Sequence, residues 1–461
     1  MKALIVILLL VFGGPLASWG ANHRRAEHQE APVKVWEAFY DGPDKEDDFA
    51  AALALDAQGN VYVTGRSFGL FSSWDYATVK YPRSGKKGLA ARYNGPPGNG
   101  PDCPAALAVD SQGNFYVTGY SRSLYGNDDI VTIKYNNKGK VGWLARYDGV
   151  GDAADRSVAM TVDSQGNVYV AGSSYGWGTR TDFVTIKYNP QGQELWAARY
   201  NGPANGHDVP VALGLDASGN VYVTGISPIP PASPYGSAPN SFATLKYSAG
   251  GQQLWVDHYC FLSKNGYQDS EPAAMAVDAQ GNVYVTGLVW GGQAGFGDLM
   301  TIKYDPDGHR EWLAQEAPGN WDNEPIAVII NQEGNIVVTG NSKNSAPVFQ
   351  HYVTLIKYAP NGAKLWTQYY NKLHASAVTG DGQDNLYVTA RQGEGAEYGA
   401  VLIKFSPSGQ VLWQTLFSNP AYSAADPVAL AADSLGNIFL AGTGFKPTGR
   451  PDFFTVMYTQ K

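Results

Sequence analysis

The stretch Asp216-Ala-Ser-Gly-Asn-Val-Tyr-Val-Thr-Gly225 decides the fold, because close copies of it recur along most of the chain. Successive copies begin 50 to 62 residues apart. A period of this length is typical of arrays in which each repeat is a four-stranded unit. There are eight copies, which begin at Asp56, Asp110, Asp163, Asp216, Asp278, Asn331, Asp381 and Asp433.

The third repeat shows what one unit contains. Residues 157–162 alternate small and apolar side chains, an Asp-Ser-Gln-Gly turn follows, and residues 167–171 form a second β-rich run. Residues 182–188 and 194–200 are another pair of such runs, joined by Asn-Pro-Gln-Gly. Both pairs have the signature of a hairpin, and no segment keeps a helical apolar period. Each repeat is therefore predicted to be an antiparallel meander of strands A to D, and radial repetition of such units forms a β-propeller.

The two ends of the repeat array predict how the ring closes. Residues 35–40 read as a strand D with no strands A to C before it, and the last repeat stops after a strand C at residues 452–458. Pairing these two segments completes the last unit and removes an exposed sheet edge. The predicted fold is all-β, an eight-bladed β-propeller of four-stranded antiparallel blades in which the N-terminal strand completes the last blade.

The N-terminal residues have the pattern of a secretory signal. A basic start is followed by an apolar run at residues 3–12 and by small residues up to Gly20. The apolar run is too short for a membrane-spanning helix. We expect a signal peptide at residues 1–20, a polar flexible segment at 21–33 and one propeller domain at 34–461. The expected location is secreted, periplasmic or on the cell surface, without membrane insertion.

The net charge bears on the class of partner, and the cysteine content bears on disulfide bonding. The net charge is −8 and no basic run is present, which argues against nucleic acid as a partner. Cys103 and Cys260 are the only cysteines. They fall in different repeats, too far apart around a ring for a disulfide bond, so we expect two unpaired thiols.

The repeat resembles a known family. The copies Val109-Asp-Ser-Gln-Gly-Asn-Phe-Tyr-Val-Thr-Gly119 and Leu215 to Gly225 resemble the SBBP-type β-propeller repeat of exported bacterial proteins. The resemblance covers all eight units and implies an exported bacterial propeller, but it carries no catalytic motif. That family is named for seven blades, and this chain has eight copies. A weaker likeness links Asn189-Pro-Gln-Gly-Gln-Glu-Leu-Trp196 to the tryptophan-docking repeats of quinoprotein dehydrogenases.

Aromatic residues point to a ligand-binding face. Antiparallel order places the A–B and C–D turns on one face of the disc, here the turn face, and the B–C and D–A loops on the other, here the loop face. Seven of the twelve Trp residues repeat in strand D, whereas four fall in the loops. Rings among polar residues suit a glycan or a protein ligand; the alternative is that they cap the blades. The candidate ligand-binding residues are Trp74, Trp177, Trp290, Trp321, Tyr125, Tyr175 and Tyr235.

A second set of residues recurs eight positions before the turn Asp. It contains Asp48, Asp102, Asp155 and Asp208, and later repeats have Ser270, Asn323, Leu373 and Ala425 instead. Two interpretations stand: the carboxylates cap amides of the neighbouring loop, or they bind a metal ion, for which calcium is the candidate. No other cofactor is expected.

Catalytic motifs are weak. Gly172-Ser-Ser-Tyr-Gly176 leaves a strand for a loop and does not open a helix, as a nucleophile elbow would. Of the scattered His residues, His351 and His374 are the pair that could approach each other. The favoured function is a non-catalytic, exported binding or scaffold module with a glycan or protein ligand on the loop face. The alternative is an enzyme with its site at the channel mouth, either a carbohydrate-active lyase or hydrolase or a quinone-dependent dehydrogenase.

Overall fold

The computed structural model describes residues 30–86, 88–96, 100–151, 153–231, 237–263, 266–291, 297–317, 321–344, 350–394, 397–447 and 449–460. The proposed signal peptide and Tyr235 lie outside these residues. No helix in the described ranges is long and apolar enough to cross a membrane.

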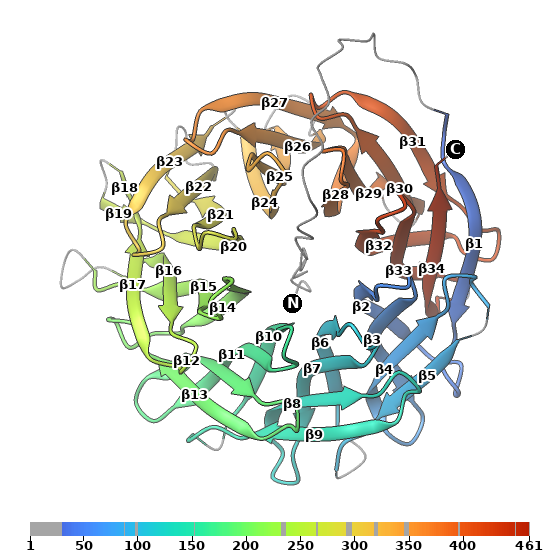
Figure 1. Ribbon diagram of the computed structural model, residues 1–461, viewed down its shortest axis with the longest axis horizontal. Coiled ribbons are helices and arrows are strands. Elements are labelled where there is room, and N and C mark those ends of the chain that lie inside the picture. Colours follow the sequence, from blue (N-terminus) through green and yellow to red (C-terminus); the bar gives the residue numbers. More distant parts are fainter. Residues whose placement is uncertain are drawn as a thin grey trace.

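Within the described residues the strands form eight four-stranded antiparallel sheets around a central axis (Figure 1). Blades 1 to 4 are consecutive: β2 (Asp48–Leu55), β3 (Val61–Gly69), β4 (Ser73–Tyr81), β5 (Leu89–Tyr93); β6 (Asp102–Val109), β7 (Phe115–Arg122), β8 (Asp128–Tyr135), β9 (Val141–Tyr147); β10 (Asp155–Val162), β11 (Val168–Gly176), β12 (Arg180–Tyr188), β13 (Glu194–Tyr200); β14 (Val209–Leu215), β15 (Val221–Pro228), β16 (Asn240–Tyr247), β17 (Gln253–Tyr259).

Blades 5 to 8 follow after a small hairpin, β18 (Phe261–Ser263) and β19 (Gly266–Gln268). They are β20 (Ser270–Val277), β21 (Val283–Val289), β22 (Asp298–Tyr304), β23 (Arg310–Glu316); β24 (Trp321–Ile330), β25 (Ile336–Asn344), β26 (His351–Tyr358), β27 (Lys364–Asn371); β28 (Leu373–Gly380), β29 (Leu386–Glu394), β30 (Glu397–Phe405), β31 (Val411–Phe417); β32 (Ala424–Ala432), β33 (Ile438–Phe445), β34 (Pro451–Thr459), β1 (Val33–Tyr40). In each blade the first strand is innermost and the last is on the rim (Figure 1).

The ring closes as the sequence predicts. Strand β1 pairs antiparallel with β34, with Trp36 opposite Met457 and Phe39 opposite Phe454. The Phe39 ring also stacks on Tyr422 at a centroid distance of 4.7 Å. The two chain ends thus build one blade together, and the eight-bladed prediction is confirmed.

The core lies between the blades, because each sheet has apolar side chains on both faces. Strands B and C are the most deeply buried; in β11, Val168 and Val170 are fully buried on one face and Tyr169 is almost fully buried on the other. Cys103 is buried and Cys260 is half-buried, and both thiols are free, as expected. Stability therefore comes from contacts around the whole ring, so a blade removed from it would expose two apolar faces.

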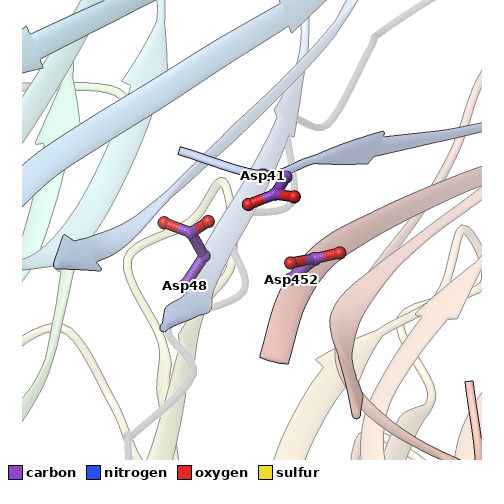
Figure 2. Close-up of side chains that lie close together, drawn as sticks. All are labelled: Asp41, Asp48 and Asp452. Carbon is purple, nitrogen blue, oxygen red and sulfur yellow. The ribbon is translucent and has the colours of Figure 1, made fainter. Parts of the chain in front are cut away.

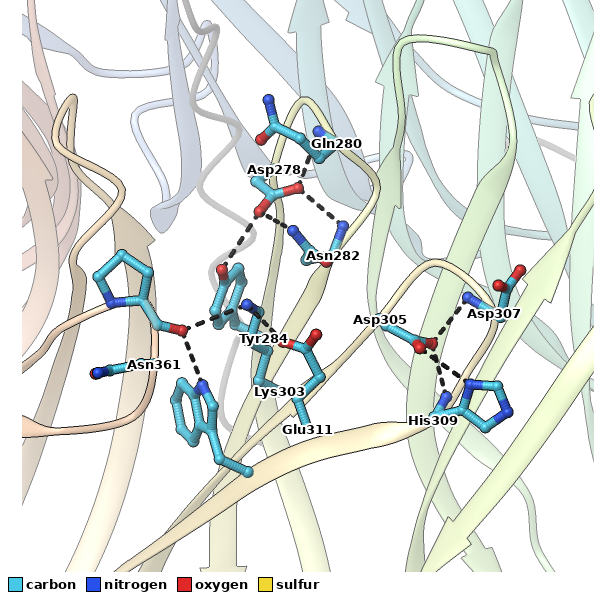
Figure 3. Close-up of polar contacts among 12 residues, drawn as sticks. Asp278, Gln280, Asn282, Tyr284, Lys303, Asp305, Asp307, His309, Glu311 and Asn361 are labelled. Atoms are coloured by element: carbon cyan, nitrogen blue, oxygen red, sulfur yellow. Dashed lines mark hydrogen bonds and ion pairs between the residues drawn. The ribbon is translucent and has the colours of Figure 1, made fainter.

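On the turn face, the recurring Asp, Asn and Tyr hold the A–B turn together. In blade 5, Asp278 accepts hydrogen bonds from the Asn282 backbone at 2.8 Å, the Asn282 amide side chain at 2.7 Å and the Tyr284 hydroxyl at 3.3 Å (Figure 3). The same bonds recur at Asp110, Asp163, Asp216 and Asp381. These repeated residues fix the turn, which explains their recurrence without a ligand.

The recurring Lys and Trp join each blade to the next. Lys303 Nζ and Trp312 Nε1 of blade 5 both donate to the backbone carbonyl of Pro360 in the C–D turn of blade 6, at 3.3 and 3.0 Å (Figure 3). The turn residue Gly362 has φ +84°, and a Cβ there would lie 2.7 Å from the Trp312 ring. We call this arrangement the interblade staple. The tryptophan bond recurs for Trp36, Trp143, Trp196, Trp255 and Trp366. The lysine bond to the same carbonyl recurs for Lys187, Lys246 and Lys357.

One tryptophan of the series lacks its acceptor. Trp413 of blade 7 faces blade 8, whose strands C and D are not joined by a turn because they come from opposite ends of the chain. Its Nε1 has no hydrogen-bond partner among the described residues. Lys404 of the same blade instead donates to the side chain of Gln460.

This exception supplies a matched test of the interblade staple. We expect Trp312→Phe to reduce the free energy of unfolding by about 1 kcal/mol more than Trp413→Phe, because only the first change removes a hydrogen bond. Urea unfolding followed by circular dichroism measures both variants. Equal losses in the two variants would contradict the staple.

Candidate functional site

The loop face carries exposed rings at the tips of neighbouring B–C loops. Phe71 in blade 1 and Tyr125 in blade 2 are each 89% exposed, and Trp177 in blade 3 is 77% exposed. Tyr175 and Trp290 are exposed to a smaller extent, at 40% and 39%. Four of the sequence candidates therefore present ring surface to solvent, and Phe71 joins them.

A hydrogen bond holds the Trp177 ring in place at the tip of its loop. Its Nε1 donates to the backbone carbonyl of Val150 in the D–A loop that enters blade 3. Gly178 within the turn and Arg180 directly after it both have positive φ, at +77° and +63°. The indole is therefore anchored through its polar edge, and its faces are left for a ligand.

Trp74 and Trp321 lie differently. Trp74 is half-buried against Phe68, with ring centroids 5.2 Å apart, and the Arg66 guanidinium lies 4.6 Å from its ring. Trp321 stacks on Tyr352 at 4.8 Å and meets Tyr369 edge-on at 5.3 Å. Both rings cover the ends of their blades and offer a ligand less area than Trp177 does.

Aliphatic side chains accompany the exposed rings. Leu70 precedes Phe71 and is 57% exposed, and Leu124 precedes Tyr125 and is 70% exposed. Leu262 and Tyr267 of the β18–β19 hairpin are exposed as well. Sequence reasoning missed these leucines and Phe71; the apolar pairs within otherwise polar loops are the signal that would have found them.

The four recurring Asp residues lie buried at the loop-face ends of the inner strands. Each accepts a hydrogen bond from the backbone N–H of a glycine in the preceding D–A loop. The pairs are Gly42 with Asp48 at 2.7 Å, Gly95 with Asp102 at 2.6 Å, Gly149 with Asp155 at 2.5 Å and Gly202 with Asp208 at 2.6 Å. This is the bond that the capping interpretation predicts.

Burial shifts the titration of these carboxyl groups. It raises the pKa of Asp48 to about 6, against hydrogen bonds from Ser67 and Gly42 that lower it, while the charges of Asp452 and Asp41 raise it further. Burial also raises the pKa of Asp102, Asp155 and Asp208, and a carboxylate from strand C of the preceding blade adds to each rise. These carboxyl groups therefore form a layer in which like charges lie close together at the blade interfaces.

An arginine from the rim strand balances part of this charge. Arg92, Arg146 and Arg199 donate to Asp75, Asp129 and Asp182 of strand C in their own blades, at 2.6, 2.8 and 2.8 Å. Each arginine also bonds a strand B serine, namely Ser67, Ser121 or Ser174. In blade 4 the equivalent residue is His258, which bonds Ser241 at 2.8 Å. The recurring Ala-Arg-Tyr in strand D was the sequence signal for this layer.

Two blade interfaces gather three carboxylates each. Asp41, Asp48 and Asp452 converge between blades 8 and 1 (Figure 2), and Asp129, Asp148 and Asp155 converge between blades 2 and 3. In each group the three ligand oxygens lie within 4.8 Å of one another. These are the groups in the described ranges that could hold a metal ion. The sequence singled out one member of each; the other members come from different strands.

The opposite half of the ring has different chemistry. At the positions of the buried carboxylates stand Leu373 and Ala425, and open cavities of about 300 Å³ lie beside both. His351 and His374 do approach each other, with ring centroids 6.2 Å apart, and His374 Nε2 lies 3.7 Å from Glu324. Burial raises the pKa of the neighbouring Asp426, against the charges of Arg391 and His374.

Comparisons with known proteins support the propeller fold. No family model matches the chain. An uncharacterised WD repeat-containing protein of Acanthamoeba polyphaga mimivirus is 24% identical over an alignment of 425 residues, which covers 74% of this chain and 28% of that protein. The chain thus spans about a quarter of the length of this distant relative.

Two solved structures align over nearly the whole chain. The Dos1 propeller does so with a TM-score of 0.55 at 7% identity, over 93% of this chain and 95% of that one. A Dyadobacter fermentans protein of unknown function has a TM-score of 0.45 at 10% identity, over 93% and 99%. At such identities the likeness to the Dos1 propeller concerns the fold alone.

Proposed function

We propose that the chain is an exported, non-catalytic binding module that holds a protein ligand on its loop face. The observation that carries this proposal is the series of exposed apolar tips on the B–C loops of blades 1, 2 and 3. Phe71, Tyr125 and Trp177 stand on a closed ring of sheets, and side chains on loops fixed by a rigid scaffold are a common way to build a binding surface.

The leucines favour a protein over a glycan. A sugar ring stacks on an aromatic face, and an aliphatic side chain provides none. Leu70, Leu124 and Leu262 are exposed beside the rings, and mixed aromatic and aliphatic contacts are typical of protein interfaces. A glycan ligand is the alternative that the experiment below separates.

Export is supported by the sequence. Residues 1–20 have the pattern of a secretory signal, and the repeats resemble the SBBP-type units of exported bacterial proteins. The proposed location is secreted, periplasmic or on the cell surface. A net charge of −8 disfavours nucleic acid as a partner there.

The test removes the three exposed rings together. We expect the variant Phe71→Ala, Tyr125→Ala, Trp177→Ala to lose the ligand. An aromatic side chain that becomes buried in the complex contributes about 1 to 2 kcal/mol or more to binding. Ligands are captured from an extracytoplasmic protein extract and, separately, on a glycan array, and affinity for the captured species is then measured by calorimetry.

A matched control removes exposed apolar side chains elsewhere. The variant Leu195→Ala, Leu254→Ala, Leu365→Ala changes the rim strands, where these leucines are 52%, 54% and 51% exposed. We expect it to bind as the unchanged protein does. If this control loses the ligand as the ring variant does, the loop face is not the binding site. If the ligand that the ring variant loses is a glycan, the proposed protein ligand is wrong.

A further inference from the structure

The two three-carboxylate groups are equivalent by their places in the blades. Each has an Asp directly after a rim strand, an Asp at the start of the next inner strand and an Asp on strand C of the preceding blade. The groups are Asp41, Asp48 and Asp452 between blades 8 and 1, and Asp148, Asp155 and Asp129 between blades 2 and 3. One arrangement is thus built twice, two interfaces apart in the ring.

In the first group a lysine supplies the balancing charge. Lys446, which follows β33, places its Nζ 3.2 Å from Asp41 Oδ2 and 2.8 Å from Asp452. The Tyr422 hydroxyl donates to Asp452 Oδ2 at 2.6 Å. The structure therefore shows a cation held by two of the three carboxylates of this group.

In the second group a carboxylate oxygen has no donor among the described residues, as is also true of Asp48 Oδ1 in the first group. Asp129 is 2% exposed, and its Oδ1 has no hydrogen-bond partner in the part of the chain that the structure describes. Its other oxygen accepts from Arg146, and Asp155 is bonded to the Gly149 N–H. Three carboxylates thus face one guanidinium, and a buried oxygen without a partner carries the full cost of its desolvation.

We propose that Asp129, Asp148 and Asp155 bind a Ca²⁺ ion between blades 2 and 3, at the place that Lys446 Nζ takes between blades 8 and 1. Ca²⁺ prefers oxygen ligands at about 2.3 to 2.6 Å, so two oxygens on opposite sides of one ion stand about 5 Å apart. The ligand oxygens of the group all lie within 4.8 Å of one another, which is inside that limit. Asp148 is exposed and leaves room for the waters that complete the coordination of such an ion.

The other carboxylate-bearing interfaces provide internal comparisons. Between blades 1 and 2, and between blades 3 and 4, Asn94 and Asn201 stand where Asp148 stands, so one of the three charges is absent. Fewer ligand charges weaken a calcium site. The ion is therefore assigned to one interface, and its binding does not depend on the proposed loop-face ligand.

The test is a calorimetric titration of CaCl₂ into chelator-treated protein. We expect saturable binding of one ion per chain, with a Kd of about 10⁻⁴ M as in other extracellular modules. Asp148→Asn should weaken binding by about tenfold or more, because it removes one charged ligand at an exposed position. The matched control Asp41→Asn changes the equivalent residue of the lysine-filled group and should leave binding unchanged.

Other results would overturn the site. Absence of saturable binding in the unchanged protein would do so, as would a Kd for Asp148→Asn equal to that of the unchanged protein. Equal weakening by Asp41→Asn would place the ion at the other interface. Thermal unfolding without CaCl₂ checks that both variants fold. With CaCl₂ added, the melting temperature should rise only in proteins that still bind the ion.

Discussion

A chain that starts at Asp41, and so lacks β1, is expected to lose cooperative unfolding and to self-associate. Blade 8 would then end at β34, whose backbone groups would form an exposed edge. Trp36, Phe39 and Tyr40 would no longer pack against their neighbours. With about 2 kcal/mol for each large apolar side chain and the lost ladder added, the cost is on the order of 5 to 10 kcal/mol, comparable with the whole stability of a domain.

Thermal unfolding and size-exclusion chromatography measure this result. The control is a chain from which only residues 1–29 are removed, which keeps β1 and should elute as the full-length protein does. A monomeric truncated chain with an unchanged melting temperature would show that β1 does not close the ring. Restoration of the transition by the added peptide Val33–Tyr40 would confirm that this strand alone supplies the missing edge.

The fold could be predicted because its signals are local. Asp216 bonds residues two, four and six positions later, and Gly219 adopts φ +77° in the same turn. Because these interactions join residues within a span of seven, the residues that make them recur as a sequence motif along the repeats. The closing strand was also predictable. The array of repeats starts with a strand D and ends with a strand C, and pairing these two strands leaves neither with an exposed edge.

The role of the recurring lysines was not predictable from local pattern. Lys80 lies 4.0 Å from the turn residue Asp56 of its own repeat. Elsewhere Lys187, Lys246, Lys303 and Lys357 donate to a backbone carbonyl of the following blade. A carbonyl has no residue signature, so a bond to one that is 50 to 62 residues away cannot be read from side-chain identities.

The candidate site was predicted in part for the same reason. Trp74 and Trp177 both lie near a B–C loop, but packing against Phe68 covers the first and a bond to Val150 presents the second. Exposure is decided by neighbours that the loop sequence does not name. The three-carboxylate groups combine residues from two blades, and recurrence within one strand revealed a single member of each.

The arginine layer leads to the second large effect. Arg199→Ala is expected to lower the free energy of unfolding by about 3 kcal/mol, because it leaves the carboxylate of Asp182 buried without its charged partner. The Asp182 side chain is 6% exposed, and Arg199 also bonds the hydroxyl and the carbonyl of Ser174. Chemical unfolding of the purified variant measures the loss.

Two further variants separate the buried charge from the loss of a side chain. Arg450→Ala removes an arginine that is 52% exposed and pairs with Glu46, and exposed pairs contribute about 1 kcal/mol or less. The double variant Arg199→Ala, Asp182→Asn should be more stable than Arg199→Ala alone, because the charge left unpaired is then gone. If the second change instead adds its own loss, the cost of Arg199→Ala comes from packing, and the charge balance between blades 3 and 4 contributes little to holding the ring together.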